Sequence, residues 1–415
     1  MNAPGRANEA AGPLRCEKDR FTLPADIHYL NCAYMGPLTA AAQHAGVEAI
    51  ARKGVPHTIG PADFFTDSDR ARSLFARLIH ADASRIAIIP AVSYGIATVA
   101  RNANVSKGDN IVVLAEQFPS NVHAWRRLAV RNDAELRTVA APRSARRGEE
   151  WNAAVFEAID DATAVVALPQ VHWTDGTRFD LVRIGVRARE VGALFVIDGS
   201  QSIGAHPFDV TEIQPDAVIC AAYKWLLGPY SVGLAYYGSR LDDGEPLEET
   251  WIGRRDSEDF RGLIHYRDEY QPGAVRYDVG ERSNFILVPM MNAALEQVVA
   301  WTPERIQQYC ERLMGGLIEE ARALGFTLED AAWRGAHLFG LRTPAGLDLE
   351  ALQHALQERN ISVSLRGSAL RVSPNVYNDD SDAEALHGAL RAAVTGRGTG
   401  AASPSPRPGA AASAR

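Results

Sequence analysis

Residues 193–224 read ALFVIDGSQSIGAHPFDVTEIQPDAVICAAYK, and they decide the fold class. The stretch contains two short apolar runs, ALFVID (193–198) and DAVICAA (216–222), of the kind that forms strands buried on both faces. Similar runs lie at 85–90, 110–115 and 163–169, and they are separated by amphipathic stretches such as SYGIATVARNAN, NVHAWRRLAVRN and VRIGVRAREVG. This alternation predicts an α/β fold with a largely parallel sheet and crossover helices.

The remainder of the chain predicts a second, smaller domain. GLAYYG (233–238) follows a Gly/Pro turn so soon that we expect it to return antiparallel. From about Pro289 one long helical pattern (290–325) leads into HLFGLRT, a helix near LEALQHALQERN, the strand-like segments ISVSLRG and ALRVSPN, and a final amphipathic helix, DAEALHGALRAAV. We expect a loose N-terminal arm at 1–28, a large domain at 29–280, a small α+β domain at 281–394 and a disordered Gly/Ala/Ser/Pro-rich tail at 395–415.

Composition narrows the classes of function. The 415 residues fit one large and one smaller domain. The net charge of −8 disfavours a nucleic acid or an anionic membrane as the partner. The four cysteines are too far apart in the sequence for a zinc site or a disulfide framework. There is neither a signal peptide nor a long apolar run, so we expect a cytoplasmic protein without a metal.

Asp198 and Lys224 are the candidate catalytic residues. Each follows an apolar strand, and ligands of open parallel sheets gather beyond the carboxyl ends of the strands. A buried carboxylate needs a positive partner. Pyridoxal phosphate requires both residue types, because a lysine amine forms a Schiff base with its aldehyde and a carboxylate keeps its ring nitrogen protonated. Gln201 would then hydrogen-bond the ring hydroxyl. An ordinary Asp–Lys ion pair is the alternative explanation.

Three other segments reach the same predicted sheet edge. PAVSYGIA follows the run at 85–90, so Ser93, Tyr94 and Gly95 can offer backbone N–H groups and a hydroxyl to a phosphate, although Ser93 could also be an ordinary helix cap. Phe118 can lie on a pyridine ring, unless it is a core residue. PQVHWTDGTRFD supplies four expected pocket-lining residues, which are His172, Trp173, Thr174 and Asp175.

With these motifs the chain resembles the class V aminotransferase family of fold type I pyridoxal phosphate enzymes, which includes cysteine desulfurases, kynureninases and isopenicillin N epimerase. The likeness extends from HYLNCAYMGPL (28–38) to RVSPNVYN (371–378). It implies a large domain with a mostly parallel seven-stranded sheet, a smaller C-terminal α+β domain and a homodimer. In the family pattern, KWLLGP places the Schiff-base lysine at Lys224 and the DxxQ pair at Asp198 and Gln201. The family's stacking ring falls on Phe118 and its phosphate turn on Ser93 and Tyr94.

The resemblance also implies a site for the substrate. The family's late arginine, which grips the α-carboxylate of the substrate, falls on Arg371, where a surface arginine is the alternative. GAVRYDVGERSNF resembles the stretch that reaches the phosphate of the neighbouring subunit, with Gly280, Glu281 and Ser283 as candidates. Tyr223 and Thr174 are further candidates for cofactor binding. The expected substrate pocket adds Asn31, Tyr34, His172, Trp173, Trp251 and Arg254.

Departures from the family pattern narrow the reaction. ISVSLRGSALR lacks the nucleophilic cysteine of desulfurases, and Gln201 stands where kynureninases place a histidine. We therefore expect an aminotransferase acting on a small-molecule amino acid. The alternatives are a β-eliminating lyase that cleaves the carbon–sulfur bond of a cysteine conjugate and an epimerase. A non-catalytic protein that binds pyridoxal phosphate is a more remote alternative.

Overall fold

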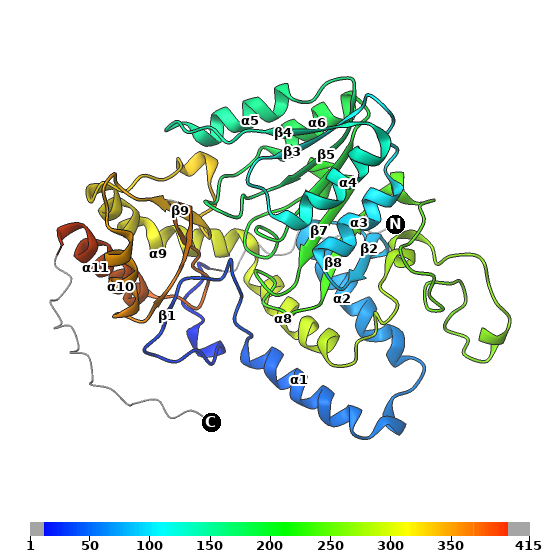
Figure 1. Cartoon of the computed structure of the whole chain (residues 1–415). Coiled ribbons are helices and arrows are strands. Elements are labelled where there is room, and N and C mark those ends of the chain that lie inside the picture. The colour runs from blue at the N-terminus through cyan, green and yellow to red at the C-terminus, as the bar shows by residue number, and fades with distance from the viewer. Residues whose placement is uncertain (1–11, 368, 397–415) are drawn as a thin grey trace, which may run out of the picture.

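A seven-stranded sheet forms the centre of the computed structural model, which describes residues 12–367 and 369–396. The strand order is β2-β8-β7-β6-β5-β3-β4. Figure 1 shows the sheet with its edge strands β2 and β4 labelled. β8 runs in the direction opposite to the other six strands, so the prediction of a mostly parallel α/β sheet is confirmed, as is the antiparallel return of 233–238. The strands are β2 (Ile86–Ile89), β3 (Asn110–Leu114), β4 (Glu135–Val139), β5 (Thr163–Pro169), β6 (Leu194–Asp198), β7 (Ala217–Ala221) and β8 (Gly233–Tyr237).

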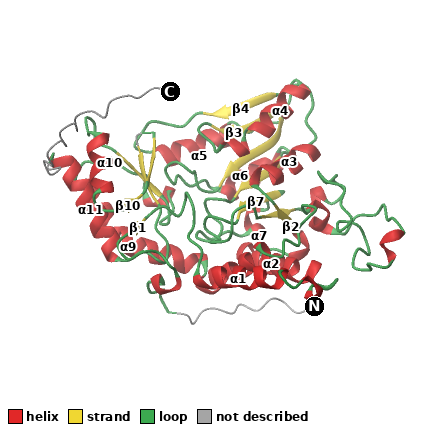
Figure 2. Ribbon diagram, turned by 60° about the horizontal axis from the view of Figure 1, so that its bottom comes forward, coloured by secondary structure: helices red, strands yellow, loops and turns green. Residues whose placement is uncertain are grey.

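Alternate residues of these strands enter two separate cores, which explains why the runs are apolar throughout. Val196 and Ile219 pack with α3 (Val92–Asn102) and α4 (His123–Asn132), whereas Ile197 and Val218 pack on the opposite face. Figure 2 shows α3 and α4 on one side of the sheet and the helices α1 and α2 on the other. The helices of this second side are α1 (Ala40–Lys53), α2 (Asp63–Ile79), α5 (Arg147–Glu157), α6 (Leu181–Glu190) and the one-turn α7 (Val210–Ile213).

The single long helical pattern predicted at 290–325 is two helices, so that expectation is wrong. Thr302 has a positive φ of 61° and is followed by Pro303, which cannot continue the backbone hydrogen bonds of the preceding helix. α8 (Leu287–Trp301) packs against α1 and α2, whereas α9 (Pro303–Ala323) packs against α11 (Asp380–Thr395). The predicted domain boundary at 280/281 stays a prediction.

The C-terminal part has a small sheet with its own core. The antiparallel order is β11-β12-β9, covered by α9, α10 and α11. The chain near the N-terminus joins this part, because β1 (His28–Tyr29) pairs in parallel with β10 (Ile361–Ser362). The remaining elements are β9 (Phe339–Arg342), α10 (Leu349–Gln357), β11 (Ser364–Arg366) and β12 (Ala369–Val372). The expectations for residues 1–11 of the arm and 397–415 of the tail lie outside the described residues.

After β1 the chain crosses to the sheet edge that carries Lys224. The Gly36 N–H donates to Tyr223 O over 2.8 Å. A Cβ at position 36 would lie 2.1 Å from Lys224 O, so only glycine allows the two backbones to approach this closely. In the described part of the chain no helix is both long and apolar enough to cross a bilayer. The same residues contain no group of three or more His, Cys, Asp or Glu side chains that could bind a metal ion.

Candidate active site

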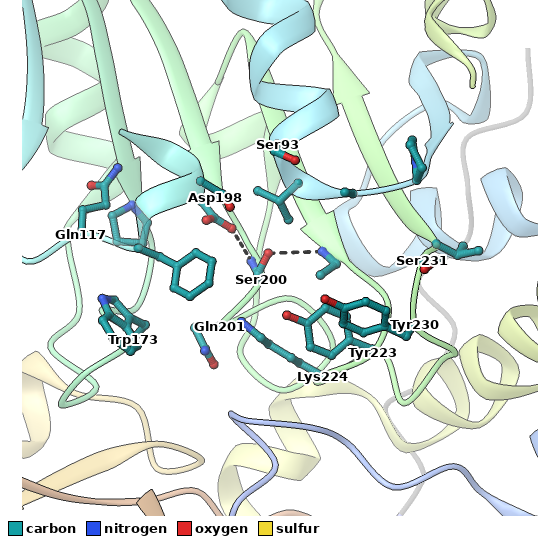
Figure 3. A pocket seen from close by; sticks show the side chains of 18 of the residues that line it. Ser93, Gln117, Trp173, Asp198, Ser200, Gln201, Tyr223, Lys224, Tyr230 and Ser231 are labelled. Atoms are coloured by element: carbon teal, nitrogen blue, oxygen red, sulfur yellow. Dashed lines mark hydrogen bonds between the residues drawn. The ribbon is translucent and has the colours of Figure 1, made fainter. Parts of the chain in front are cut away.

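A cavity of about 290 Å³ lies where the parallel strands end. Pro169, Asp198 and Ala221 are the last residues of β5, β6 and β7, and all three line it. Figure 3 shows the side chains of Asp198, Gln201, Tyr223 and Lys224 around this space. The α/β topology therefore brings together the two predicted catalytic residues, although 26 residues separate them in the sequence.

Asp198 is a buried carboxylate without a cationic partner. Its side chain is 7% exposed, and Oδ1 accepts a hydrogen bond from Ser200 N at 3.0 Å. No basic side chain of the described residues forms an ion pair with it, so the alternative of an ordinary Asp198–Lys224 salt bridge does not describe this structure. A carboxylate in this position calls for a positively charged group in the cavity.

Lys224 follows β7 on a well-anchored loop. The next three residues, Trp225, Leu226 and Leu227, are buried in the core and fix the backbone from which the lysine extends. Lys224 Nζ lies 5.2 Å from the centroid of the Phe118 ring. Burial lowers the pKa of Lys224 to about 8, even though the Asp198 charge works in the opposite direction. A larger fraction of this amine is therefore neutral, and hence nucleophilic, than in an ordinary lysine.

This lowered pKa predicts how the cofactor-free protein takes up pyridoxal phosphate at different pH values. Below pH 8 the Lys224 amine is mostly protonated, so the rate constant for cofactor uptake should rise about tenfold per pH unit. Above pH 8 the rate constant should level off, instead of rising up to 10.5 as for an ordinary lysine. Stopped-flow absorbance measures this rate. Asp198→Asn should move the midpoint to lower pH, because Asp198 raises the pKa of Lys224. A midpoint near pH 10 would contradict the prediction.

Gln201 lines the cavity, but both ends of its amide are already used. Nε2 donates to Ala33 O at 3.1 Å, and Oε1 accepts from Trp225 Nε1 at 2.9 Å. The side chain thus ties the loop of Lys224 to the segment that enters from β1. The hydrogen bond predicted from Gln201 to a ring hydroxyl competes with these two contacts.

The predicted phosphate turn has one residue at the cavity and two beside it. Ser93 lines the cavity in the first turn of α3, where N–H groups have no partner within the helix. The N–H groups of Tyr94 and Gly95 donate to Ala91 O instead. A Cβ on Gly95 would lie 2.7 Å from Ile219 Cγ2, so this glycine allows α3 to pack closely on β7. The buried Tyr94 hydroxyl has no hydrogen-bond partner among the described residues.

The aromatic wall of the cavity consists of Phe118 and Trp173. Phe118 is 36% exposed, which excludes the alternative of a core phenylalanine. The two rings meet edge to face with centroids 5.5 Å apart, and Trp173 Nε1 donates to Glu116 O at 2.6 Å. Both side chains line the same cavity as Lys224. A flat ligand beside Lys224 would therefore have an aromatic face available for stacking.

Arg371 is a buried cation without an acid. It is 1% exposed, so the alternative of a surface arginine is wrong. Nη1 donates to Trp173 O at 2.8 Å and Nη2 to Ser364 Oγ at 3.4 Å, while Nε has no partner among the described residues. Asn31 supports this arrangement, because its Oδ1 accepts from Ser364 Oγ at 2.9 Å. Burial, followed by the nearby Arg366, lowers the pKa of Arg371 to about 10, so the site favours an incoming anion.

Several predicted residues do not line the cavity of Lys224, and Arg371 and Asn31 are two of them. His172 is fully buried, with Nδ1 2.8 Å from Thr174 Oγ1, and burial lowers its pKa to about 4. Thr174 and Asp175 line a neighbouring chamber. Tyr34 is largely exposed. A separate cavity of about 320 Å³ is lined by Trp251, Gly280, Glu281 and Ser283. Arg254 lines yet another hollow beside it. These five residues between 251 and 283 would reach a Lys224 cavity only if a second subunit supplied them.

Five polar residues of the lining were not predicted, and they are Gln117, Ser120, Ser200, Tyr230 and Ser231. Gln117 and Ser120 flank Phe118, and Ser200 lies two residues after Asp198, so proximity to predicted residues was the available signal. Tyr230 and Ser231 follow the KWLLGP segment. Ser231 has a φ of 66°, a turn conformation for which a serine gives no clear sequence signal.

Comparison with known proteins now identifies the family. The family model "Aminotransferase class-V" matches residues 57–393. The chain belongs to the class V aminotransferase family. The resemblance found in the sequence is thereby confirmed, together with fold type I and dependence on pyridoxal phosphate.

The relatives of this class V enzyme are named for different reactions. An uncharacterized aminotransferase of Bacillus subtilis, YcbU, is 26% identical, with 74% of this chain and 79% of that protein covered. The isopenicillin N epimerase of Streptomyces clavuligerus is also 26% identical, with 78% and 83% covered. Among solved structures, a C-DES mutant with glycine covalently linked to the PLP cofactor has a TM-score of 0.80 at 18% identity, with 90% of this chain and 98% of that chain covered. That similarity shows the fold alone.

Proposed function

We propose that this class V enzyme is an aminotransferase that acts on a small-molecule α-amino acid. The observation that carries the proposal is the single amine of the cavity. Apart from the Asp198 carboxylate, which the ring nitrogen of the cofactor would occupy, Lys224 is the only side chain of the described lining that can accept a proton from a substrate near neutral pH. Burial raises the pKa of the neighbouring Tyr223 to about 12, and the nearby His172 lies outside the cavity. One base can move the α-proton to another atom on the same face, as transamination requires.

The lining residues fit pyridoxal phosphate. Lys224 would hold its aldehyde, Asp198 its ring nitrogen, the Phe118 ring would stack on it, and Ser93 with the start of α3 would bind its phosphate. When bound, this cofactor withdraws electrons from the α-carbon of an amino acid. Arg371 would bind the α-carboxylate with its guanidinium fork, and Lys224 would then take the α-proton. Phe118 and Trp173 would keep water from the reacting atoms.

The cysteines offer no nucleophile for sulfur transfer. All four are described; none lines the cavity, and Cys32, Cys220 and Cys310 are buried. Cys32 approaches Lys224 from behind, with Sγ 3.8 Å from Lys224 O, and burial raises its pKa to about 12. A thiolate is the reactive form, so this thiol would be inert. Because all four cysteines are free, we also propose the cytoplasm as the compartment of the enzyme.

Epimerisation is the second candidate, and the similarity to isopenicillin N epimerase favours it. Direct inversion at the α-carbon needs a proton donor on the face opposite Lys224. The described lining offers there neither a histidine nor a second lysine. The lining of a single chain therefore favours transamination.

Product analysis tests the proposed reaction. We expect the holoenzyme to convert an amino acid to its keto acid once per active site, and to turn over repeatedly only when a second keto acid is added. Mass spectrometry of the products, with chiral chromatography of the remaining amino acid, measures this. Pyruvate and ammonia released without an added keto acid would show β-elimination instead. Inversion of the substrate without keto-acid formation would show epimerisation. Either result would overturn the proposal.

We further propose a homodimer, with neither a nucleic acid nor a membrane as partner. Tyr230, at the edge of the Lys224 cavity, and Trp251 are both large exposed aromatic residues. A second copy that covered both would remove apolar surface from water. Light scattering coupled to size-exclusion chromatography tests this, and a monomer at micromolar concentration would contradict it.

A further inference from the structure

A basic chamber adjoins the Lys224 cavity. It has a volume of about 1260 Å³ and lies between the loop after β3, α9 and the β11–β12 hairpin. Gln117, Phe118 and Trp173 line both spaces, so the two are adjacent and share one wall. The Trp173 ring belongs to this shared wall, so a substrate that bridges the two spaces would pass beside it.

Positive charge dominates the lining of this chamber. Five arginines face two carboxylates, although the chain as a whole carries a net charge of −8. Asp175 is shared, because its Oδ2 lies 3.0 Å from Arg147 Nε and 2.7 Å from Arg342 Nη2. The other carboxylate, Glu116, is 3.6 Å from Arg147. Arg147 and Arg342 take up both acids, and Arg322 pairs with Glu319 at 2.9 Å, so the positive charge left on this wall is that of Arg143 and Arg366.

Arg366 lies against Trp173, a residue that lines both the chamber and the Lys224 cavity. Its guanidinium lies 5.5 Å from the centroid of the Trp173 ring, and Nη1 donates only to the carbonyl of the neighbouring Leu365, at 2.8 Å. Within the described residues it forms no ion pair, and its buried Nε has no partner. Arg366 also disfavours the charge of Arg371. Two neighbouring guanidinium groups without an acid, here Arg366 and Arg371, raise the free energy of the folded state unless bound anions neutralise them.

Trp173 connects the two arginines. Its carbonyl accepts from Arg371 and its ring lies against Arg366, so the two cations flank one residue. An amino acid bound with its α-carboxylate on Arg371 would extend its side chain toward Trp173 and Arg366. A guanidinium fork binds carboxylates, phosphates and sulfonates alike, because all present two or more oxygens at matching spacing.

We propose that the substrate is an α-amino acid whose side chain ends in an anionic group, and that Arg366 binds this group in the basic chamber. This inference rests on the proposed function and specifies its substrate class. Neutral amino acids of the same length lack this contact.

Binding to the borohydride-reduced holoenzyme tests the proposal without turnover. Calorimetry should show that adipate binds at least about tenfold more tightly than hexanoate, which has the same chain length but one carboxylate. Arg366→Gln should bring the two affinities within about threefold. Arg131→Gln, which removes the same charge from exposed α4, should leave the preference unchanged. The ligands 4-phosphonobutanoate and 4-sulfobutanoate show which anion the chamber prefers.

Turnover provides the second measurement. The ratio of kcat/KM for L-2-aminoadipate to that for L-norleucine should exceed about ten and fall toward one in Arg366→Gln. Equal affinities for adipate and hexanoate in the wild type, or a preference that survives in Arg366→Gln, would overturn the inference. If norleucine reacts as well as aminoadipate, only the substrate class is wrong and the proposed function stands. If no amino acid reacts and no carboxylate binds, the proposed function fails with it.

Discussion

Lys224→Ala will lower turnover by on the order of 10³-fold or more and will leave a protein that no longer holds its cofactor covalently. Lys224 supplies the only amine of the described cavity lining and is also the proposed proton acceptor, so one substitution removes both the attachment point and the base. Single-turnover kinetics and the visible absorbance of the purified protein measure the two losses separately.

Lys107→Ala is the matched control. Lys107 is exposed and paired with Asp133 at 2.7 Å, far from the cavity lining. Its replacement should leave both absorbance and turnover unchanged. The assignment would be wrong if the Lys224→Ala protein kept a covalent cofactor after borohydride reduction. It would also be wrong if methylamine added to the Lys224→Ala protein restored no proton transfer while the cofactor was still bound.

Arg371→Met will weaken the binding of amino acids and of simple carboxylates by about 2–5 kcal/mol, which is roughly 30-fold or more. The guanidinium of Arg371 is buried with no acid beside it, so an α-carboxylate bound there would neutralise an unbalanced buried charge. Methionine fills similar space without the charge. The thermal midpoint of the ligand-free protein should stay at or above that of the wild type, because an unneutralised buried cation is removed.

Arg371→Lys separates charge from geometry. Lysine keeps the positive charge but cannot bind a carboxylate through two parallel hydrogen bonds, so its affinity should lie between those of the wild type and Arg371→Met. Spectroscopic titration with an amino acid that reacts gives the three dissociation constants. Wild-type affinity in Arg371→Met, or a large drop in its thermal midpoint, would show that Arg371 has a structural role.

The sequence predicted the parts of the site that follow directly from strand order. Asp198 and Lys224 each end or follow an apolar strand, and parallel strands bring such residues to one edge. The sequence did not reveal β4, whose residues are mostly polar because it is the outermost strand and only Val139 is buried. Nor did it show the break at Thr302, because the apolar periodicity continues across it.

Short sequence motifs predicted which residues belong to the site but not which contacts they make. Gly95 belongs to the predicted phosphate turn, yet its missing side chain serves the packing of α3 on Ile219. The Gln201 amide is already used by Ala33 and Trp225, which are distant in the sequence. The chamber around Arg366 was not predicted at all, because its arginines come from segments that meet only in the folded chain. Tertiary contacts between distant segments decide these points, and no short pattern encodes them.

The most direct test is to find where the cofactor is attached. The chain contains only four lysines, at positions 18, 53, 107 and 224, so peptide mass spectrometry after borohydride reduction of the holoenzyme gives an unambiguous answer. We expect one phosphopyridoxyl group per chain, on the peptide that contains Lys224. A label on Lys18, Lys53 or Lys107, or an unlabelled protein, would contradict the account.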